Sequence, residues 1–366
     1  MIVSLRKQIL LTLLTVVFFI LFTGSLSAVQ VIPLGELNRP ISINVDDAYI
    51  YIVEFPGIYL YSPADFKLVK KFGKKGEGPG EIMGFNRVHL HVQPDKIILS
   101  NRHKIMYFSK QGDFLKEFKS NPSFWGSVIP IEGNFVALNR PPLNRPRNTS
   151  IYFHNTSIYD PDLKKITDIH QGDYWYQHLT QSKKNSLPLY IQFPQFHVYD
   201  NKIFLKGLEE DFVINVFDAS GQKLYSINRE YKKIKMTEAD KKRYLDYFKT
   251  SRVFGKAYEQ MKPRLEFPVY FPALQTFVIA DGKIYAVTYG KKNGKTEVLV
   301  LDLKGKLLQT VFLPLYQRDD ELAMTLENRV SRQVTNSTFA IKNGKFYQVL
   351  ENQDEKSWEL HIHEIK

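Results

Sequence analysis

The chain reads Asp47-Ala48-Tyr49-Ile50-Tyr51-Ile52-Val53 near its beginning, a turn that leads into an alternating β-strand. The same combination of turn residues that tolerate a positive φ with β-branched and aromatic residues recurs five more times. The other copies are Asp95–Leu99, Gly133–Leu138, Asn201–Leu205, Gly282–Val287 and Gly344–Val349. Six copies of one unit indicate an architecture built from repeats.

A second turn follows most copies and precedes a further strand. It occurs at Tyr61–Asp65, Phe108–Gly112, Tyr159–Asp162, Phe217–Gly221 and Leu301–Gly305. Each repeat therefore contains two hairpins in series, which make a four-stranded sheet. The segments lack the three- and four-residue apolar spacing of helical repeats, so this pattern favours a propeller over a helical solenoid.

The sixth copy has no second turn. After it comes only the strand Trp358–Ile365, whereas an extra strand, Val29–Leu34, stands alone near the start. Pairing the extra strand with the last repeat closes a ring and leaves only short, protected edges. We therefore predict an all-β, six-bladed β-propeller of four-stranded blades, with the last blade closed by the N-terminal strand.

Two stretches break the repeat and predict helical insertions, at about 237–262 and 319–334. Thr237 is suited to cap the first helix, and Pro263 marks its end. Leu322, Leu326 and Val330 are spaced four apart in the second. Both insertions are interpreted as props that cover gaps between blades, or else as a lid or a docking element for a partner.

The first 27 residues predict a signal peptide. Arg6 and Lys7 precede an apolar run, Ile9–Phe22, and small residues follow it, so that cleavage after Ser27 is expected. The run is shorter than a membrane-spanning helix requires. The prediction is an exported, periplasmic or extracellular chain whose domain spans 28–366, with an uncleaved N-terminal anchor as the alternative.

The composition excludes several classes of site. The chain has no cysteine, which excludes disulfides, thiolate zinc sites and cysteine nucleophiles. Its net charge is +12, but lysine and arginine are scattered, and no nucleic-acid-binding module is recognisable. The charge predicts a solvated basic surface, or alternatively a weak attraction to anionic polysaccharide or membrane.

The most distinctive local string is Gly76-Glu77-Gly78-Pro79-Gly80-Glu81-Ile82. It lacks the Gly-Lys-Ser/Thr ending and following helix of a phosphate-binding loop. The string resembles the bacterial six-bladed β-propeller family related to NHL-repeat proteins, in which Gly-Pro-Gly-Glu-Phe links one blade to the next. Here Ile82 replaces the aromatic residue. The resemblance implies an exported propeller and no defined activity.

The residues of this loop, Gly76, Gly78, Pro79, Gly80 and Glu81, allow two interpretations. In the first the loop is structural: Glu81 caps backbone amides, and the glycines permit close approach to the neighbouring blade. In the second the loop lines one mouth of the central channel, with Asn86 and Arg87 just beyond it as polar contacts.

Catalytic motifs are not evident. Neither a Gly-x-Ser-x-Gly elbow nor a His-Glu-x-x-His zinc motif is present. His89 and His91 share one face of a predicted strand and could be two metal ligands, but histidines on strands that pack between blades are more commonly hydrogen-bonded core residues, and this interpretation is favoured. His361 and His363 repeat this spacing.

Two functions are the main candidates, and a sensor or structural subunit of an envelope complex is a third. The first is a monomeric binding or scaffold module for an envelope or extracellular protein or a glycan, without a cofactor. The alternative is an extracytoplasmic metal-dependent hydrolase or lyase, similar to lactonases, with a divalent cation in the channel. Its inward-facing candidates are the mostly neutral residues Asn44, Asn86, His197 and Gln275, which would bind a cation weakly. We therefore favour the binding module, with no nucleic acid and no membrane span after leader cleavage.

Overall fold

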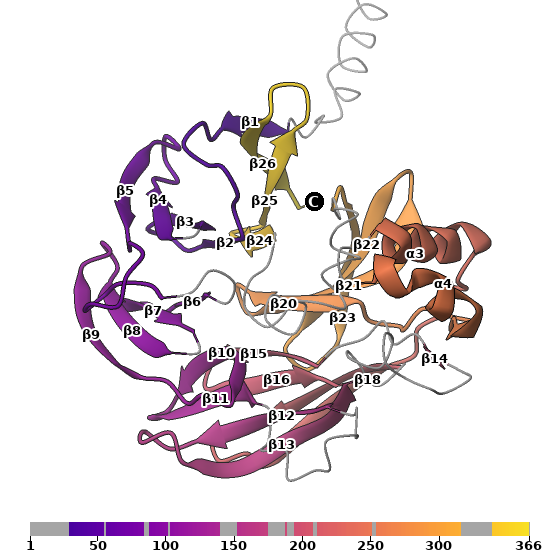
Figure 1. Cartoon of the computed structure of the whole chain (residues 1–366), viewed down its shortest axis with the longest axis horizontal. Helices are drawn as coiled ribbons and strands as arrows, with labels where there is room; N and C mark the ends of the chain where they lie inside the picture. Colours follow the sequence, from indigo (N-terminus) through magenta and orange to yellow (C-terminus); the bar gives the residue numbers. More distant parts are fainter. Residues whose placement is uncertain are drawn as a thin grey trace, which may run out of the picture.

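The computed structural model describes residues 29–365, apart from residues 55, 84–87, 102, 140–151, 175–186, 189–193, 208–210, 251–253 and 316–338. Six four-stranded antiparallel sheets form a ring (Figure 1). The six-bladed β-propeller predicted from the repeats is confirmed. The leader, residues 1–27, and the second helical insertion at 319–334 lie outside the described residues.

Each blade runs from an innermost to an outermost strand. Blade 1 contains β2 (Ser42–Val45), β3 (Ile50–Glu54), β4 (Gly57–Tyr61) and β5 (Leu68–Phe72). Blade 2 contains β6 (His89–Val92), β7 (Lys96–Ser100), β8 (Lys104–Ser109) and β9 (Phe114–Lys119). Blade 3 contains β10 (Phe124–Ile131), β11 (Asn134–Asn139), β12 (Tyr152–Tyr159) and β13 (Lys165–Tyr174). Blade 4 contains β15 (Gln195–Tyr199), β16 (Lys202–Lys206), β17 (Phe212–Phe217) and β18 (Lys223–Arg229). Blade 5 contains β20 (Thr276–Ala280), β21 (Lys283–Lys292), β22 (Lys295–Asp302) and β23 (Leu307–Leu313).

Blade 6 joins the two ends of the described chain. Its strands are β24 (Phe339–Lys342), β25 (Lys345–Asn352), β26 (Ser357–Glu364) and, on the outside, β1 (Gln30–Pro33). Strand β1 pairs antiparallel with β26, with Gln30 opposite Ile362. The indole Nε1 of Trp358 also donates to the carbonyl of Asn38 at 2.9 Å. The predicted closure of the last blade by the N-terminal strand is thus confirmed.

The core lies between the blades because side chains on successive strand residues point to opposite faces. In β3, Tyr51 and Val53 pack against blade 2, whereas Ile50 and Ile52 pack against blade 6. Every pair of neighbouring blades buries one such apolar cluster, so six clusters hold the ring together. Stability therefore depends on contacts between repeats more than within them.

The tight turns explain why the repeats are recognisable in sequence. In blades 3 to 6 the inner hairpins close with two residues that both have a positive φ, as at Asp281 (50°) and Gly282 (70°), or Asn343 (51°) and Gly344 (68°). Such turns match the right-handed twist of the flanking strands and favour Asp, Asn and Gly. These four hairpins therefore favour the residue types that mark their repeats.

One helical insertion lies between β18 and β20. It contains α3 (Glu238–Thr250), the 3₁₀ turn η1 (Gly255–Ala257), α4 (Tyr258–Met261) and the 3₁₀ turn η2 (Lys262–Arg264). Thr237 Oγ1 accepts from the amide of Asp240, as expected of an N-cap. The insertion also contributes β19 (Leu265–Glu266), which pairs in parallel with β14 (Leu187–Pro188). The predicted single helix is therefore a sequence of shorter helical pieces.

Outer-turn glycines bring successive blades into close contact, which gives a first prediction. A Cβ on Gly305, in the outer turn of blade 5, would lie 2.4 Å from Ile227 Cγ2 in blade 4. A Cβ on Gly133, in the inner turn of blade 3, would meet nothing within 4 Å. Both glycines have a positive φ, of 90° and 84° respectively. We expect Gly305→Ala to lower the free energy of unfolding by about 2–4 kcal/mol, and Gly133→Ala by only about 1 kcal/mol.

Urea unfolding of the two variants measures both values. The difference between them isolates the contact between blades from the backbone cost that the two substitutions share. Equal destabilisation of the two variants would show that the close approach at Gly305 contributes nothing.

Candidate binding face and central channel

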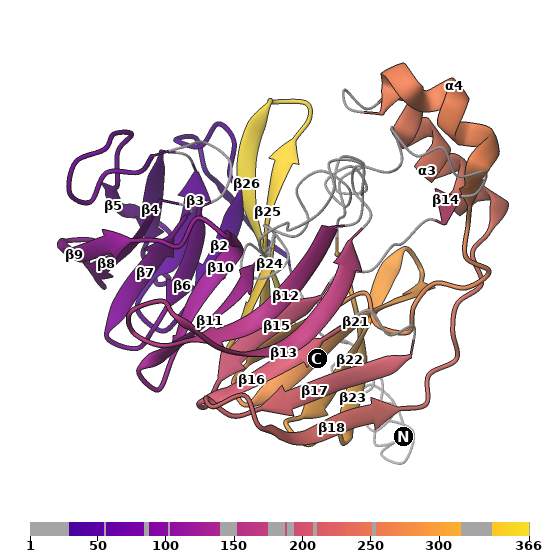
Figure 2. The same cartoon turned by 60° about the horizontal axis from the view of Figure 1, so that its bottom comes forward.

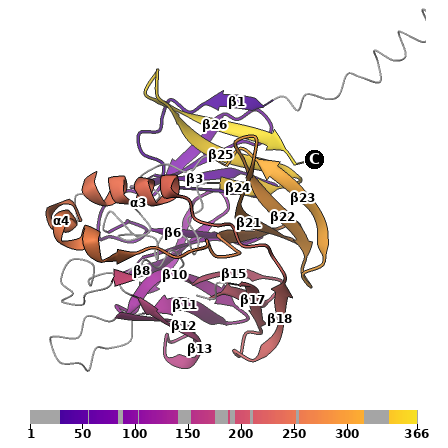
Figure 3. The ribbon, with the colours of Figure 1, turned by 90° about the vertical axis from the view of Figure 1, so that its right-hand side faces the viewer.

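The two ends of the ring differ in the length of their loops. Because all four strands of a blade are antiparallel, the inner and outer hairpin turns lie at one end, here named the turn end. The connections between blades, such as residues 73–83, lie at the other end, here named the insertion end. Figure 2 shows α3 and α4 standing beyond the strands at the insertion end. In the side view the same helices lie on the opposite side of the disc from the outer hairpin of β22 and β23 (Figure 3).

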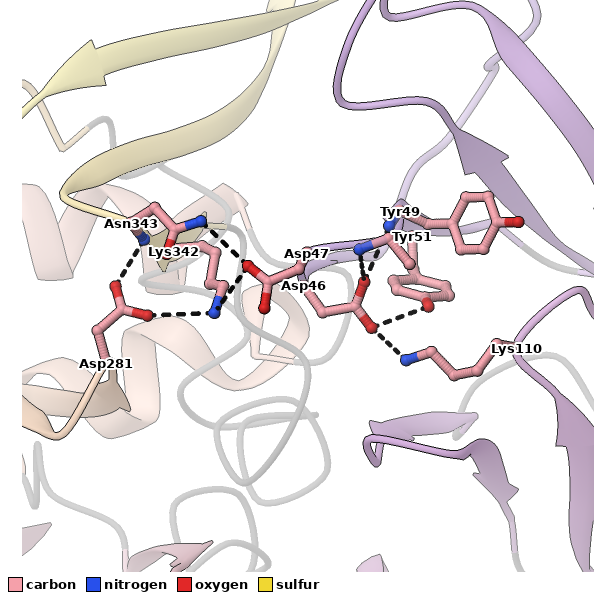
Figure 4. A network of polar contacts seen from close by, with 9 residues as sticks. Asp46, Asp47, Tyr49, Tyr51, Lys110, Asp281, Lys342 and Asn343 are labelled. Atoms are coloured by element: carbon pink, nitrogen blue, oxygen red, sulfur yellow. Dashed lines mark hydrogen bonds and ion pairs between the residues drawn. The ribbon is translucent and has the colours of Figure 1, made fainter.

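Polar contacts tie the ring together at the turn end (Figure 4). The Nζ of Lys342, in blade 6, lies 3.1 Å from Asp47 Oδ1 in blade 1 and 3.3 Å from Asp281 Oδ1 in blade 5. Asn343 donates from its amide to Asp281 Oδ2 at 2.5 Å and from Nδ2 to Asp47 Oδ1 at 3.1 Å. The hydrogen bonds of Asn343 and Lys342 lower the pKa of Asp47.

The network extends to blade 2 through Asp46. Its Oδ1 accepts from the amides of Ala48 and Tyr49, both at 2.8 Å, and its Oδ2 accepts from the Tyr51 hydroxyl at 3.0 Å. Lys110 of blade 2 forms an ion pair with the same carboxylate. Four successive blades are therefore linked across the closing seam, and these residues have a structural role.

The channel-facing strands carry a set of equivalent positions. The inner strands align by their two-residue turns, such as Asp47-Ala48 in blade 1, because the residues that flank each turn pair with one another. Three positions before these turns lie Asn44, His91, Ile129, His197, Val278 and Ala340 in blades 1 to 6. One level of the ring thus combines three polar side chains with three aliphatic ones.

Both histidines of this level are held neutral. Burial, with a smaller contribution from His197, lowers the pKa of His91 to about 4. Burial likewise lowers the pKa of His197 to about 4, against an opposing hydrogen bond with the backbone of Phe277. Each imidazole is therefore uncharged at neutral pH, where it can donate one hydrogen bond and accept another.

A glutamine fixes the position of His197. The Nε2 of Gln195 lies 3.3 Å from His197 Nε2 and donates to the carbonyl of Phe277 at 3.1 Å. Its Oε1 accepts from Thr276 Oγ1 at 2.8 Å. Gln195 therefore links the inner strands of blades 4 and 5 through hydrogen bonds.

Strand β2 presents two buried polar atoms toward blade 2. Ser42 Oγ and Asn44 Nδ2 have no hydrogen-bond partner among the residues that the structure describes. Buried polar atoms are usually hydrogen-bonded, so this pair marks the start of blade 1 as a candidate contact for a bound molecule.

The structure describes three of the five channel contacts that the sequence predicts. Asn44 and His197 lie at the same level of the channel. Gln275 immediately precedes β20, where its amide donates to the carbonyl of Val287 at 2.9 Å. Asn86 and Arg87 are outside the described residues. The sequence did not lead us to place His91 at this level, although counting three residues back from the inner turn of blade 2 would have placed it there.

The glycine-rich loop packs on the outer strands of blade 2. Glu81 Oε2 accepts from the amide of Gly78 at 2.9 Å, and a Cβ on Gly76 would lie 1.9 Å from the same oxygen. The amide of Gly80 donates to Glu117 Oε2 at 2.9 Å. Pro79 lies between these two anchored glycines. These contacts are with the loop itself and with β9, whereas the channel-facing strand of blade 2 is β6.

The helical insertion has a small core of its own. Tyr244, Phe248 and Met261 are among its buried residues. Its two ends pair with one another, because the amide of Met236 donates to the carbonyl of Val269 at 3.0 Å and that of Phe271 to Ile234 at 2.8 Å. The insertion is therefore joined to the ring by a two-stranded neck and also packs on blade 5, where Tyr289 of β21 stacks on Phe271 with ring centroids 4.4 Å apart.

The surface of this unit is both basic and partly apolar. Residues 231–271 contain 11 Lys and Arg against 5 Asp and Glu, a net charge of +6 out of +12 for the chain. Val269 and Tyr270 in the neck are 62% and 48% exposed. Lys232 and Lys235 beside them are also exposed. Half of the net positive charge of the chain is therefore concentrated in this unit, although lysine and arginine look scattered when the sequence is considered alone.

Comparisons with known proteins identify no family. No family model matches the chain, and no curated protein matches it. Solved structures with a similar arrangement include a DUF4221 family member from Bacteroides vulgatus, at 10% identity over 92% of this chain and 97% of that chain, with a TM-score of 0.46. A protein of unknown function from Bacteroides caccae is 10% identical over 77% and 84% of the two chains, with a TM-score of 0.40. The computationally designed Ika8 protein is 8% identical over 90% and 98%, with a TM-score of 0.41. Likenesses this distant carry no inference about function.

Within the described residues, no three His, Cys, Asp or Glu side chains are grouped so as to hold a metal ion. No helix in that part of the chain is long and apolar enough to cross a membrane.

Proposed function

We propose that the chain is an exported binding or scaffold module that holds a protein or glycan ligand at its insertion end. The observation that carries this proposal is the helical insertion, which projects from the ring, concentrates half of the net charge and exposes Val269 and Tyr270. Exposed aromatic side chains ringed by charge are typical of recognition surfaces. Export is inferred from Arg6, Lys7 and the apolar run Ile9–Phe22, and the mature domain is proposed to be a monomer in a periplasmic or extracellular setting.

The properties of the turn end also favour a ligand site at the insertion end. Its loops are short, and several of its charged groups, such as Lys342, Asp47 and Asp281, link blades. The insertion end instead carries the long connections, and connections on a rigid scaffold are where binding residues usually lie. The ligand is therefore expected at the end that bears α3 and α4.

Charge reversal on the insertion tests this proposal. We expect the combined variant Lys232→Glu, Lys235→Glu and Tyr270→Ala to weaken ligand binding about tenfold or more, because it removes cationic and aromatic contacts together. Binding is measured on an array of acidic and neutral glycans and on purified envelope proteins of known charge. The matched control is Lys223→Glu with Lys306→Glu, which reverses two exposed lysines at the turn end. Equal losses in both variants would contradict an insertion-end site.

A metal-dependent hydrolase or lyase is the alternative. It would have its divalent cation in the channel, near Asn44, His91 and His197. Elemental analysis of the purified protein separates the two functions: a near-stoichiometric metal whose removal lowers the melting temperature would favour the enzyme and direct assays to lactones and esters.

A further inference from the structure

A pocket of about 400 Å³ lies at the insertion end of blade 2, away from the channel and from the helical insertion. Its lining combines apolar and polar groups and includes residues from β8, β9 and the connections on either side. The lining residues are Met83, His103, Lys104, Glu117, Phe118, Lys119, Ser120 and Pro122. The volume falls in the range of small-molecule sites.

The connection that carries the glycine-rich loop contributes Met83 to one wall of this pocket. Lys104 Nζ donates to the carbonyls of Glu77 at 2.7 Å and Gly78 at 2.8 Å, and it pairs with Glu117 at 2.8 Å. Asn101 Nδ2 donates to the carbonyl of Met83 at 3.2 Å. The loop is therefore held in place by charged and amide groups whose hydrogen bonds are already used, and the pocket wall is preformed.

Other polar groups of the pocket remain available. Ser120 is 4% exposed, and its Oγ has no hydrogen-bond partner among the described residues. Lys119 and His103 are exposed, and neither side chain forms an ion pair within that same part of the chain. Because Lys104 neutralises Glu117, the remaining charge at the pocket is the positive charge of Lys119.

These groups define the chemistry of a ligand. A buried hydroxyl donor and a lysine suit a carboxylate, which accepts hydrogen bonds at two oxygens. Met83, Phe118 and Pro122 offer an apolar wall for a ring or acyl body. We propose that this pocket binds a small carboxylate that carries such a body. The inference goes beyond the proposed function, because it does not depend on the helical insertion.

Two pairs of probes test the proposal on the purified full-length chain by calorimetry and ligand-observed NMR. Glucuronate and glucose form one pair, and hippurate and its amide form the other; in each pair only the first compound carries a carboxylate. Binding of either acid in preference to its uncharged partner supports the site, and which acid binds distinguishes a sugar acid from an acylated amino acid. No binding of either acid up to about 10 mM, or equal binding of acid and uncharged partner, would overturn it.

Variants locate the binding in this pocket. We expect Lys119→Gln to weaken binding of the acid about tenfold and Ser120→Ala to weaken it about three- to tenfold. Lys116→Gln is the matched control, since Lys116 lies on the same strand with its Nζ 5.0 Å from the centre of the Tyr107 ring, outside the pocket. Circular dichroism confirms that each variant is folded. Equal binding by the Lys119 and Lys116 variants would place the ligand elsewhere, whatever the outcome at the helical insertion.

Discussion

Deletion of residues 29–33, the strand β1 with Val29 before it, is expected to lower the free energy of unfolding by several kcal/mol and to promote association. The deletion removes the pairing of β1 with β26, and each lost hydrogen bond costs on the order of 1 kcal/mol. It also uncovers Trp358 and Leu360, which belong to the cluster between blades 6 and 1. The bare edge of β26 would then be available to another chain.

Two measurements check this prediction. Thermal unfolding compares the internal deletion with the intact chain, and size-exclusion chromatography reports association. A synthetic peptide that spans residues 28–35 is the control, since it can occupy the vacant edge and should restore most of the lost melting temperature. An unchanged melting temperature after the deletion would contradict closure of the ring by β1.

Acid is expected to destabilise the protein well above the pH at which carboxylates titrate. The folded-state pKa values of His91 and His197 are about 4, below the unfolded value of about 6.5. The unfolded chain therefore binds more protons than the folded chain between these two pH values. The contribution of the two neutral histidines to the free energy of unfolding is fully present above about pH 6.5 and is lost as the pH falls toward 4. At pH 5 the loss is expected to be about 2 kcal/mol for each histidine.

Urea unfolding at pH 7.5 and pH 5 measures this dependence. The double variant His91→Gln and His197→Gln should lose most of it, because glutamine does not titrate. His103→Gln is the control, since His103 is exposed at the insertion end. A double variant that retains the full pH dependence would show that the two channel histidines are not its source.

The sequence determines the blades because their local chemistry repeats. Two-residue turns with positive φ require Asp, Asn or Gly, as at Asp281 and Gly282, and the alternating strands that follow pack on both neighbouring blades. The closing strand was predictable by counting, since the last repeat lacked one strand and the N-terminus offered one. These features can be predicted from residues that are close in sequence or from the number of repeats.

Contacts across blades could not be predicted in the same way. Asn343 and Asp47 are 296 residues apart in sequence, and their hydrogen bond exists only because the ring closes. The level shared by Asn44, His91 and His197 likewise depends on the register of three separate inner strands. The break between α3 and α4 was missed because the apolar spacing continues across it from Phe248 to Tyr258 and Met261.

The measurement that most directly tests the central claim is ligand binding by a chain whose helical insertion, residues 237–268, is replaced by a short Gly-Ser linker. The neck that joins Met236 to Val269 lets the chain cross this gap without disturbing β18 or β20. We predict an unchanged six-bladed fold, shown by circular dichroism and a cooperative melt, together with loss of binding to the protein or glycan that the intact chain retains. Undiminished binding by the shortened, folded chain would contradict a binding module that works through its insertion end.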